Sequence, residues 1–144
     1  MIRKASLDDL NDIYNIEVSS FDTPWEKASI EVEFYKDYAN IYVYEIDKKV
    51  AAYIITWLLG AEAELITIAV DEDWRRQGIG KALFAYMRTL YGENIIWHLE
   101  VACDNENAIR MYKGFGFEIT STIANYYGDN KNAYRMILSP NNNL

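Results

Sequence analysis

A stretch near the middle of the chain combines glycine with positive charge. It lies between an apolar run at residues 65–70 and an amphipathic segment at residues 79–90, and it reads Arg75, Arg76, Gln77, Gly78, Ile79, Gly80 and Lys81. This order predicts a strand, a turn and a helix. N–H groups at a helix start are unpaired and partly positive, and glycine lets a bulky anion approach them closely. The stretch is therefore a candidate phosphate-binding loop. The alternative is an ordinary strand-to-helix turn with solvated basic residues.

Two common phosphate loops do not fit this stretch. A P-loop has a glycine where this chain has Arg75, and a serine or threonine where it has Ala82. A dinucleotide-binding fingerprint has a small third residue where this chain has Leu83. The pattern that remains is an arginine followed by two spaced glycines after a strand.

Other reactive side chains are few. Cys103 and His98 are the sole thiol and imidazole, and their spacing would place them on opposite faces of a continued strand. We expect Cys103 to be a small buried hydrophobe and His98 to be packed or hydrogen-bonded. The sequence contains no nucleophile constellation and no His/Cys/carboxylate cluster typical of a metal site, so no metal is expected.

Acidic residues are concentrated in the first half of the chain. The net charge is −8; residues 1–72 hold 6 Lys/Arg and 15 Asp/Glu, whereas residues 73–144 hold 8 and 7. An acidic half repels nucleic acid and attracts cations, so no nucleic acid partner is expected. We infer an anionic cofactor on one side and a cationic acceptor on the other. The alternative is that acidity only keeps the protein soluble.

The length of 144 residues suits one domain. We expect that domain at residues 1–139 and a frayed tail at residues 140–144. One cysteine excludes an internal disulfide. The first residues lack the apolar run of a signal peptide, and the longest apolar block, residues 50–59, is too short to span a bilayer. These features predict a cytoplasmic protein without a membrane partner.

Apolar spacing predicts strands and helices that interleave. Strands are expected at residues 2–5, 41–46, 50–57, 62–70, 94–102, 117–127 and 131–138, and helices after Ser6, at about 27–36, at 79–90 and after Asn105. Ser6 and Asp9 have the spacing of a capping box, and Pro24 ends the first helix. The pattern indicates one α/β domain with a mixed sheet.

Several motifs in the right order resemble the GNAT superfamily of N-acetyltransferases. Residues 68–81 are similar to its central strand and pyrophosphate loop, and residues 105–117 to its next helix and strand. The nearest branch is the RimI-like N-terminal acetyltransferases, named for alanine acetylation of a ribosomal protein; its features here are Pro24-Trp25, Leu99-Glu100-Val101 and Asn125-Tyr126-Tyr127. The resemblance implies a single GNAT domain, with a mixed sheet of about six or seven strands flanked by about four helices, and acetyl-CoA as co-substrate.

Direct acetyl transfer to an amine requires a base, and an acid for the leaving thiolate. Glu100 lies late in an apolar strand, where partial desolvation raises a carboxyl pKa toward the useful range, so it is the candidate base. The alternative is a structural ion pair with a nearby arginine. The resemblance implies Tyr112 as the acid, and a core aromatic is its alternative.

The resemblance also implies the binding residues. Acetyl-CoA would contact Ile68, Ala69, Val70, Arg75, Arg76, Gln77, Gly78, Ile79, Gly80, Lys81 and Asn105. A backbone N–H of residues 68–70 would meet the oxyanion. The acceptor would contact Trp25, Tyr126 and Tyr127, for which simple packing is the alternative. Arg75 stands where some members have glutamine, and the turn at residues 128–130 is shorter than in some relatives.

The acceptor expected from this chemistry is a protein or peptide N-terminus, with a ribosomal protein among the candidates. An α-amino group titrates near 8 and a lysine near 10.4, so the first loses its proton more readily at neutral pH. A small amine, polyamine or lysine side chain is the first alternative. A non-catalytic coenzyme A-binding module is the second. The sequence does not indicate an oligomeric state.

Overall fold

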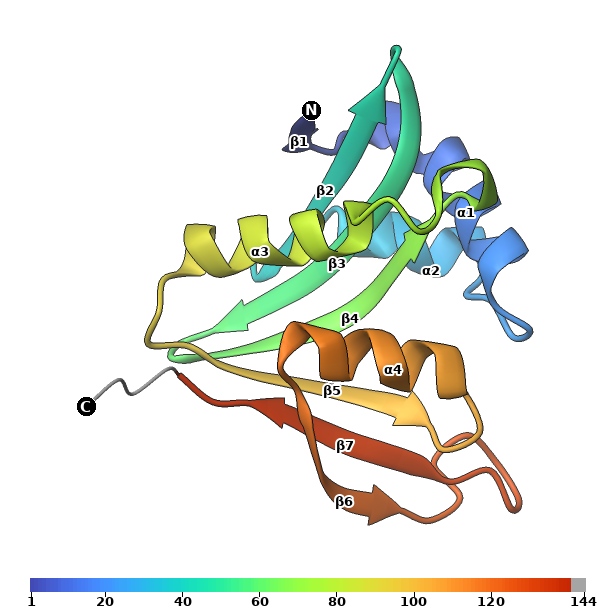
Figure 1. The fold of residues 1–144 in the computed structure, drawn as a ribbon. Helices are drawn as coiled ribbons and strands as arrows, with labels where there is room; N and C mark the ends of the chain where they lie inside the picture. Colours follow the sequence, from blue (N-terminus) through green and yellow to red (C-terminus); the bar gives the residue numbers. More distant parts are fainter. Residues whose placement is uncertain (141–144) are drawn as a thin grey trace.

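One seven-stranded sheet forms the centre of the molecule (Figure 1). The computed structural model describes residues 1–140. The strands are β1 (Ile2–Lys4), β2 (Ala39–Ile46), β3 (Lys49–Leu59), β4 (Glu62–Val70), β5 (Ile96–Ala102), β6 (Glu118–Ile123) and β7 (Ala133–Leu138). The helices are α1 (Leu10–Ser20), α2 (Lys27–Glu33), α3 (Ile79–Tyr91) and α4 (Glu106–Phe115), with short 3-10 turns η1 (Leu7–Asp9) and η2 (Glu72–Trp74).

The sheet is mixed, and its order is β1-β2-β3-β4-β5-β7-β6. Every neighbouring pair is antiparallel except β4 and β5, which run parallel. Those two strands are in register over three pairs, from Glu62 opposite Ile96 to Glu64 opposite His98. Beyond this point they diverge, as Figure 1 shows. A bulge in β4 beside Ile66 begins at the same level, because Thr56 faces Leu65 while Ile55 faces Thr67.

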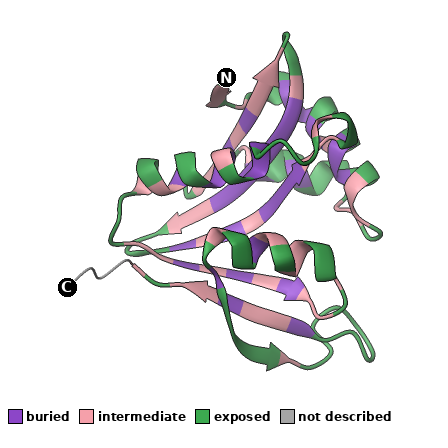
Figure 2. Cartoon of the chain, viewed as in Figure 1, coloured by how far each residue is buried: buried purple, intermediate pink, exposed green. Residues whose placement is uncertain are grey.

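Helices cover both faces of the sheet. α3 and α4 pack on one face, where Leu83, Phe84 and Tyr112 join buried residues of the strands. α1 and α2 pack on the other, where Ile13 and Ile30 meet a second set of buried strand residues. Figure 2 shows the burial concentrated in the central strands, whereas β6 is largely exposed. The apolar stripe predicted for residues 79–90 is thus the inner face of α3.

The two hairpins differ in how they turn. Asp47 and Lys48 both have positive φ (51° and 65°), the geometry of a two-residue turn that matches strand twist, so β2 and β3 form the tight hairpin predicted from the sequence. The last hairpin departs from prediction, because residues 124–132 form a loop instead of continuing the strands. Asn125, Gly128 and Asn130 have positive φ, which interrupts the strand ladder.

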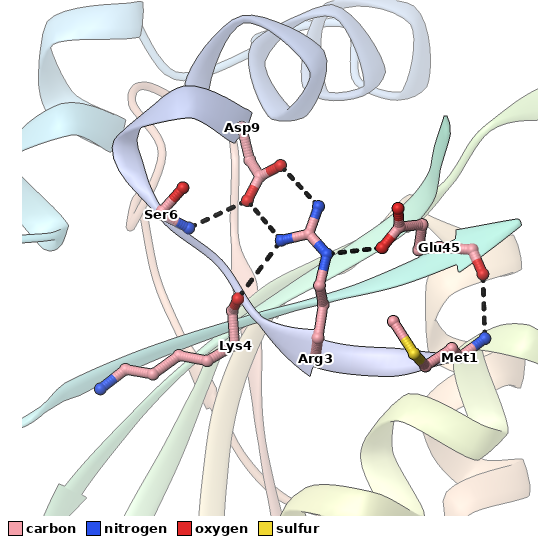
Figure 3. A network of polar contacts seen from close by, with 6 residues as sticks. All are labelled: Met1, Arg3, Lys4, Ser6, Asp9 and Glu45. Atoms are coloured by element: carbon pink, nitrogen blue, oxygen red, sulfur yellow. Dashed lines mark hydrogen bonds and ion pairs between the residues drawn. The ribbon is translucent and has the colours of Figure 1, made fainter. Parts of the chain in front are cut away.

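Polar contacts fix the start of the chain beside β2 (Figure 3). Arg3 donates to both carboxylate oxygens of Asp9 at 2.9 Å and to Glu45 Oε2 at 2.6 Å. The Ser6 N–H donates to Asp9 Oδ2 at 2.9 Å. The Asp9 half of the predicted capping box therefore forms, and Asp9 also anchors β1 through Arg3. Arg3 holds the pKa of the Asp9 carboxyl below its usual range.

The predicted fold class is confirmed: residues 1–140 form one mixed α/β domain with seven strands and four α-helices. Some boundaries were wrong. α2 ends at Glu33, earlier than expected, and β5 begins at Ile96 because residues 93–95 connect it to α3. Residues 141–144 of the expected tail lie outside the described residues. No helix of residues 1–140 is both long enough and apolar enough to cross a membrane.

Candidate active site

A cleft of about 760 Å³ opens where β4 and β5 separate. Residues from α1, the α1–α2 connection, β4, β5, the β5–α4 connection, α4 and the β6–β7 loop line it. They are Glu17, Ser20, Phe21, Asp22, Thr23, Trp25, Ile66, Thr67, Glu100, Val101, Ala102, Cys103, Asp104, Asn105, Tyr112, Tyr127, Asn130, Lys131 and Asn132. The cleft thus brings together five residues predicted from the sequence: Trp25, Glu100, Asn105, Tyr112 and Tyr127.

Glu100 projects from β5 on the sheet face opposite α3 and α4. Its neighbours Leu99 and Val101 are buried against α3 and α4, and strand alternation turns Glu100 the other way, with 17% of its side chain exposed. Burial raises the pKa of the Glu100 carboxyl, Arg135 lowers it, and Glu64 raises it. The Arg135 Nη2 atom lies 3.4 Å from Glu100 Oε1. Both sequence interpretations therefore describe this residue: it is partly desolvated and it faces an arginine.

Tyr112 reaches the cleft from α4, on the other side of the sheet. It is 7% exposed, and burial is the main cause that holds the pKa of its phenol well above the usual range. Its hydroxyl has no hydrogen bond to another group among residues 1–140, although its ring packs against Phe115 and Phe117. Tyr112 is thus both a core aromatic and a protonated O–H donor at the cleft.

The two tyrosines of the β6–β7 loop lie differently. Tyr127 lines the cleft, and burial raises its pKa to about 12. Tyr126 is 49% exposed, does not line the cleft and packs edge-on against Tyr127, with ring centroids 4.8 Å apart. Asparagine side chains shape this loop: Asn132 Oδ1 accepts the Asn125 N–H at 3.0 Å, and Asn125 Oδ1 accepts from Asn130 at 2.9 Å.

The remaining residues of special chemistry have defined partners or places. Asn105 caps α4, its Oδ1 accepting the Ala108 N–H at 3.2 Å. His98 is hydrogen-bonded, as expected, through Nε2 to Glu62 Oε1 at 2.8 Å. Cys103 is not the buried hydrophobe that we expected, because it is partly exposed and lines the cleft just beyond β5.

The glycine loop lies between β4 and α3. Gly78 begins the helix with φ 77° and ψ 14°, a left-handed conformation that glycine adopts without strain. The Ala82 N–H donates to Gly78 O at 3.0 Å, whereas the N–H groups of Ile79, Gly80 and Lys81 have no acceptor among the described residues. These three groups form the free donor array expected at a helix start. The loop does not line the cleft.

Contacts of Gly80 and Arg75 connect the loop to the cleft. A Cβ added at Gly80 would lie 3.7 Å from Val70 Cγ2 and 3.8 Å from Met111 Sδ, so the loop touches β4 and α4 beside Tyr112. Arg75 donates from Nε to Val70 O at 2.9 Å and from Nη2 to Ser20 Oγ at 3.2 Å. Its guanidinium therefore anchors the loop to the sheet and to α1.

The edge of β4 between the loop and the cleft also offers backbone donors. The Asp71 N–H donates to Ala51 O on β3 at 2.8 Å. In an antiparallel ladder successive N–H groups point to alternate sides, so Ala69 donates toward β3 as well. The N–H groups of Ile68 and Val70 therefore point toward the side that β5 leaves open. The loop and this edge of β4 therefore both carry backbone N–H groups that are free to bind a ligand.

Glu17 of α1 is a buried polar residue of the cleft that the sequence interpretation missed. It is 2% exposed, and its carboxylate accepts hydrogen bonds from Tyr53, Thr67 and the Trp25 N–H. The signal was present: Glu17 follows Ile13 by four residues, on a helix face that is otherwise apolar. A carboxylate at a core position indicates a specific set of donors.

The lining of the cleft carries four carboxylates and one lysine. The carboxylates are Glu17, Asp22, Glu100 and Asp104, and the lysine is Lys131. Such a lining favours a cationic ligand. Residues 1–140 contain no group of three or more His, Cys, Asp or Glu side chains placed to hold a metal ion.

Comparison with known proteins identifies the class. The model of the Acetyltransferase (GNAT) family matches residues 10–117, so this chain belongs to that family and is an acyltransferase. The family predicted from the loop and its flanking motifs is thereby confirmed.

Individual relatives are consistent with the predicted branch. The chain is 35% identical over 132 residues to a putative ribosomal protein bS18-alanine N-acetyltransferase of Bacillus subtilis, covering 90% of this chain and 87% of that protein. It is 34% identical over 122 residues to the Escherichia coli enzyme of that name, covering 83% and 81%.

Solved structures agree. The ribosomal-protein-S18-alanine N-acetyltransferase of Escherichia coli superimposes with a TM-score of 0.87 at 29% identity, covering 100% of this chain and 97% of that one. Ard1 of Thermoplasma volcanium gives 0.88 at 34% identity, covering 97% of each.

Proposed function

We propose that this protein transfers an acetyl group from acetyl-CoA to the α-amine of a protein or peptide N-terminus. One observation carries the proposal: Glu100 and Tyr112 come from opposite faces of the sheet and line the same cleft, at the gap between β4 and β5. A base and an acid on two sides of one reacting centre are what direct acyl transfer to an amine requires. A non-catalytic coenzyme A-binding module would need neither.

The residues around α3 fit acetyl-CoA. The unpaired N–H groups of Ile79, Gly80 and Lys81 suit a pyrophosphate, and Arg76, Gln77 and Gly78 complete the loop around them. The N–H groups of Ile68 and Val70 suit the amide-bearing arm and the oxyanion. Asn105, which lines the cleft at the start of α4, is a further candidate contact for this arm. The thioester supplies an acetyl carbon that reacts directly with the amine.

Each side chain then has a defined task. Glu100 accepts a proton from the acceptor ammonium, and the raised pKa of its carboxyl makes it a better base than an ordinary glutamate. The nitrogen–carbon bond forms first and gives an oxyanion, and the carbon–sulfur bond breaks when that oxyanion collapses. Tyr112 donates its proton to the departing sulfur, and its raised pKa keeps that proton in place until then. The second proton lost by the nitrogen restores the Tyr112 phenol after Tyr112 has protonated the sulfur.

The acceptor side is acidic, which suits an α-ammonium group. Trp25 and Tyr127 line this side, and exposed Tyr126 packs against Tyr127. The bS18-alanine N-acetyltransferase names of the relatives make a ribosomal protein N-terminus the first acceptor to test. A ribosomal acceptor also agrees with the cytoplasmic location predicted from the sequence. Small amines and lysine side chains are the competing acceptors.

The test is an acceptor panel followed by thiol release. Acetyl-CoA is supplied with N-terminal peptides, the same peptides blocked at the α-amine, polyamines and lysine peptides. We expect release only with free α-amines. Equal release with blocked lysine peptides would contradict an α-amine acceptor, and binding of acetyl-CoA without release on any acceptor would favour the non-catalytic module.

Substituting Glu100→Gln tests the base. We expect kcat at neutral pH to fall about 100-fold, because a positioned base contributes on that order, while the Kd for acetyl-CoA stays the same. Glu118→Gln, on exposed strand β6, is the matched control and should behave as the unaltered protein. An equal loss of turnover and of acetyl-CoA affinity in Glu100→Gln would remove Glu100 from this role.

A further inference from the structure

A buried carboxylate of α1 is hydrogen-bonded to β3, to β4 and to the segment between α1 and α2. Glu17 Oε2 accepts the Trp25 N–H at 3.0 Å. Glu17 Oε1 accepts from the Tyr53 hydroxyl and, at 3.3 Å, from the Thr67 hydroxyl. Glu17 belongs to α1, Tyr53 to β3 and Thr67 to β4, while Trp25 lies in the connection between α1 and α2.

This arrangement is costly to build, which indicates a specific use. Burying a carboxylate is unfavourable unless hydrogen bonds replace its hydration. No lysine or arginine pairs with Glu17 among the described residues; its donors are two hydroxyls and one backbone N–H. Burial, followed by the charge of Glu17, holds the pKa of the Tyr53 phenol well above its usual range. Tyr53 therefore remains a donor to Glu17.

The hydrogen bond to Glu17 is the polar anchor of the segment that contains Trp25, which also packs against the apolar cluster of Ile13 and Ile30. Among the described residues, it is the single hydrogen bond made by residues 22–25. That segment contributes Asp22, Thr23 and Trp25 to the lining of the cleft. Thr67, which donates to the same carboxylate, follows the β4 bulge at Ile66, and both residues line the cleft. The position of the segment relative to β4 is thus set through Glu17.

We infer that Glu17 is a positioning residue that holds residues 22–25 at the spacing an acceptor peptide requires. The inference rests on the proposed function. Glu17 does not reach the donor loop, so its effect should fall on acceptor binding. Loss of the bond would let the segment move away from β4 and weaken contacts that bind the peptide.

The chain contains a matched control for a buried carboxylate. Glu33 of α2 is also 2% exposed, and its Oε1 accepts from Trp57 Nε1 at 2.6 Å. Its second oxygen pairs with Lys36, and it does not line the cleft. A substitution at Glu33 therefore reports the general cost of altering a buried carboxylate, without an effect on residues 22–25.

The experiment compares Glu17→Gln with Glu33→Gln. Both should melt at lower temperature than the unaltered protein. We expect only Glu17→Gln to raise the KM for the acceptor peptide, by about tenfold, because one hydrogen bond to a charged group has that magnitude. Its kcat and its Kd for acetyl-CoA should stay close to the original values. An unchanged KM, or a KM raised equally in both variants, would overturn the inference.

A second variant acts on the same carboxylate from outside the cleft. Tyr53→Phe removes one donor to Glu17, and Tyr53 does not line the cleft. We expect a smaller rise in the KM for the peptide and faster hydrogen exchange at the Trp25 amide in both Glu17→Gln and Tyr53→Phe. Slow exchange at Trp25 in Glu17→Gln would contradict the anchoring contact. If the unaltered protein acetylates no peptide, the proposed function itself fails, which is a separate result.

Discussion

Opposing influences act on the Glu100 carboxyl. Burial raises its pKa, and Arg135 on the neighbouring strand β7 lowers it from 3.4 Å away. The pKa of the proposed base therefore depends on both its burial and its distance from Arg135. The observable consequence is the position of the acidic limb of the pH–rate profile, which follows the pKa of the base in the free enzyme.

Replacing Arg135 by glutamine should move that limb. Arg135 lowers the pKa of Glu100, so removing its charge raises that pKa. The carboxylate then forms at higher pH, and the acidic limb of kcat/KM shifts to higher pH. Arg110→Gln, on the exposed side of α4, is the control and should leave the limb in place. A shift to lower pH, or equal shifts in both variants, would contradict the assignment of Glu100 as the titrating base.

Sequence reasoning reached some site residues and missed others for a physical reason. Glu100 and Tyr112 were predicted because local spacing and the family motifs place them at strand and helix positions beside the loop. Glu17 was missed because its donors come from β3, β4 and Trp25, and the sequence does not reveal which strands lie beneath α1. Cys103 was assigned to the core because free cysteine is commonly buried, yet it follows the end of β5.

Elements were predicted better than the gaps between them. Periodicity gave the bounds of β4, and nearly those of α3, because their apolar stripes meet the core. It gave no sign that β4 and β5 pair over a short length only, since pairing length depends on two segments distant in sequence. Tyr126 and Tyr127 were expected in a strand; positive φ at Asn125 and Gly128 places them in a loop.

The start of α3 can be tested as an element. Gly78→Val should weaken acetyl-CoA binding by at least about tenfold, because a β-branched residue resists the left-handed conformation that aims the loop. Gly60→Val is the matched control: Gly60 has φ 66° in the β3–β4 turn, and neither glycine has an atom within 4 Å of an added Cβ. Both changes should cost about 1–2 kcal/mol of folding free energy. Calorimetric titration with acetyl-CoA distinguishes them, and equal affinities would contradict the loop assignment.

At the scale of the whole molecule, the cleft and the loop at α3 differ in charge. The net charge is −8, and the cleft carries four carboxylates with one lysine, whereas the loop at α3 holds Arg76 and Lys81. Two of these carboxylates, Glu17 and Asp22, come from the acidic first half of the chain, and Glu100 and Asp104 come from the second half, so the charge of the two halves alone does not account for the acidity of the cleft. Long-range attraction should assist a basic acceptor.

Salt should reveal this attraction. For an acceptor peptide with lysines after its N-terminal residue, we expect the KM to rise severalfold between about 50 mM and about 500 mM NaCl, because ions at the higher concentration screen charges beyond a few ångströms. A peptide with neutral side chains at those positions is the control and should change less. Steady-state kinetics with both peptides makes the comparison. Identical salt responses would show that the acidity of the cleft does not guide the acceptor.

The parallel ladder between β4 and β5 is three pairs long, so packing of α3 and α4 must supply much of the connection between the two parts of the sheet. Acetyl-CoA bound along the open edge of β4 would contact both parts of the sheet, and the unfolded chain offers it no such site. Its binding would therefore hold the two parts together, and the free energy of unfolding would rise with the logarithm of its concentration. The melting temperature of this enzyme should accordingly rise with the concentration of acetyl-CoA. In a cell depleted of acetyl-CoA, the enzyme should unfold more readily.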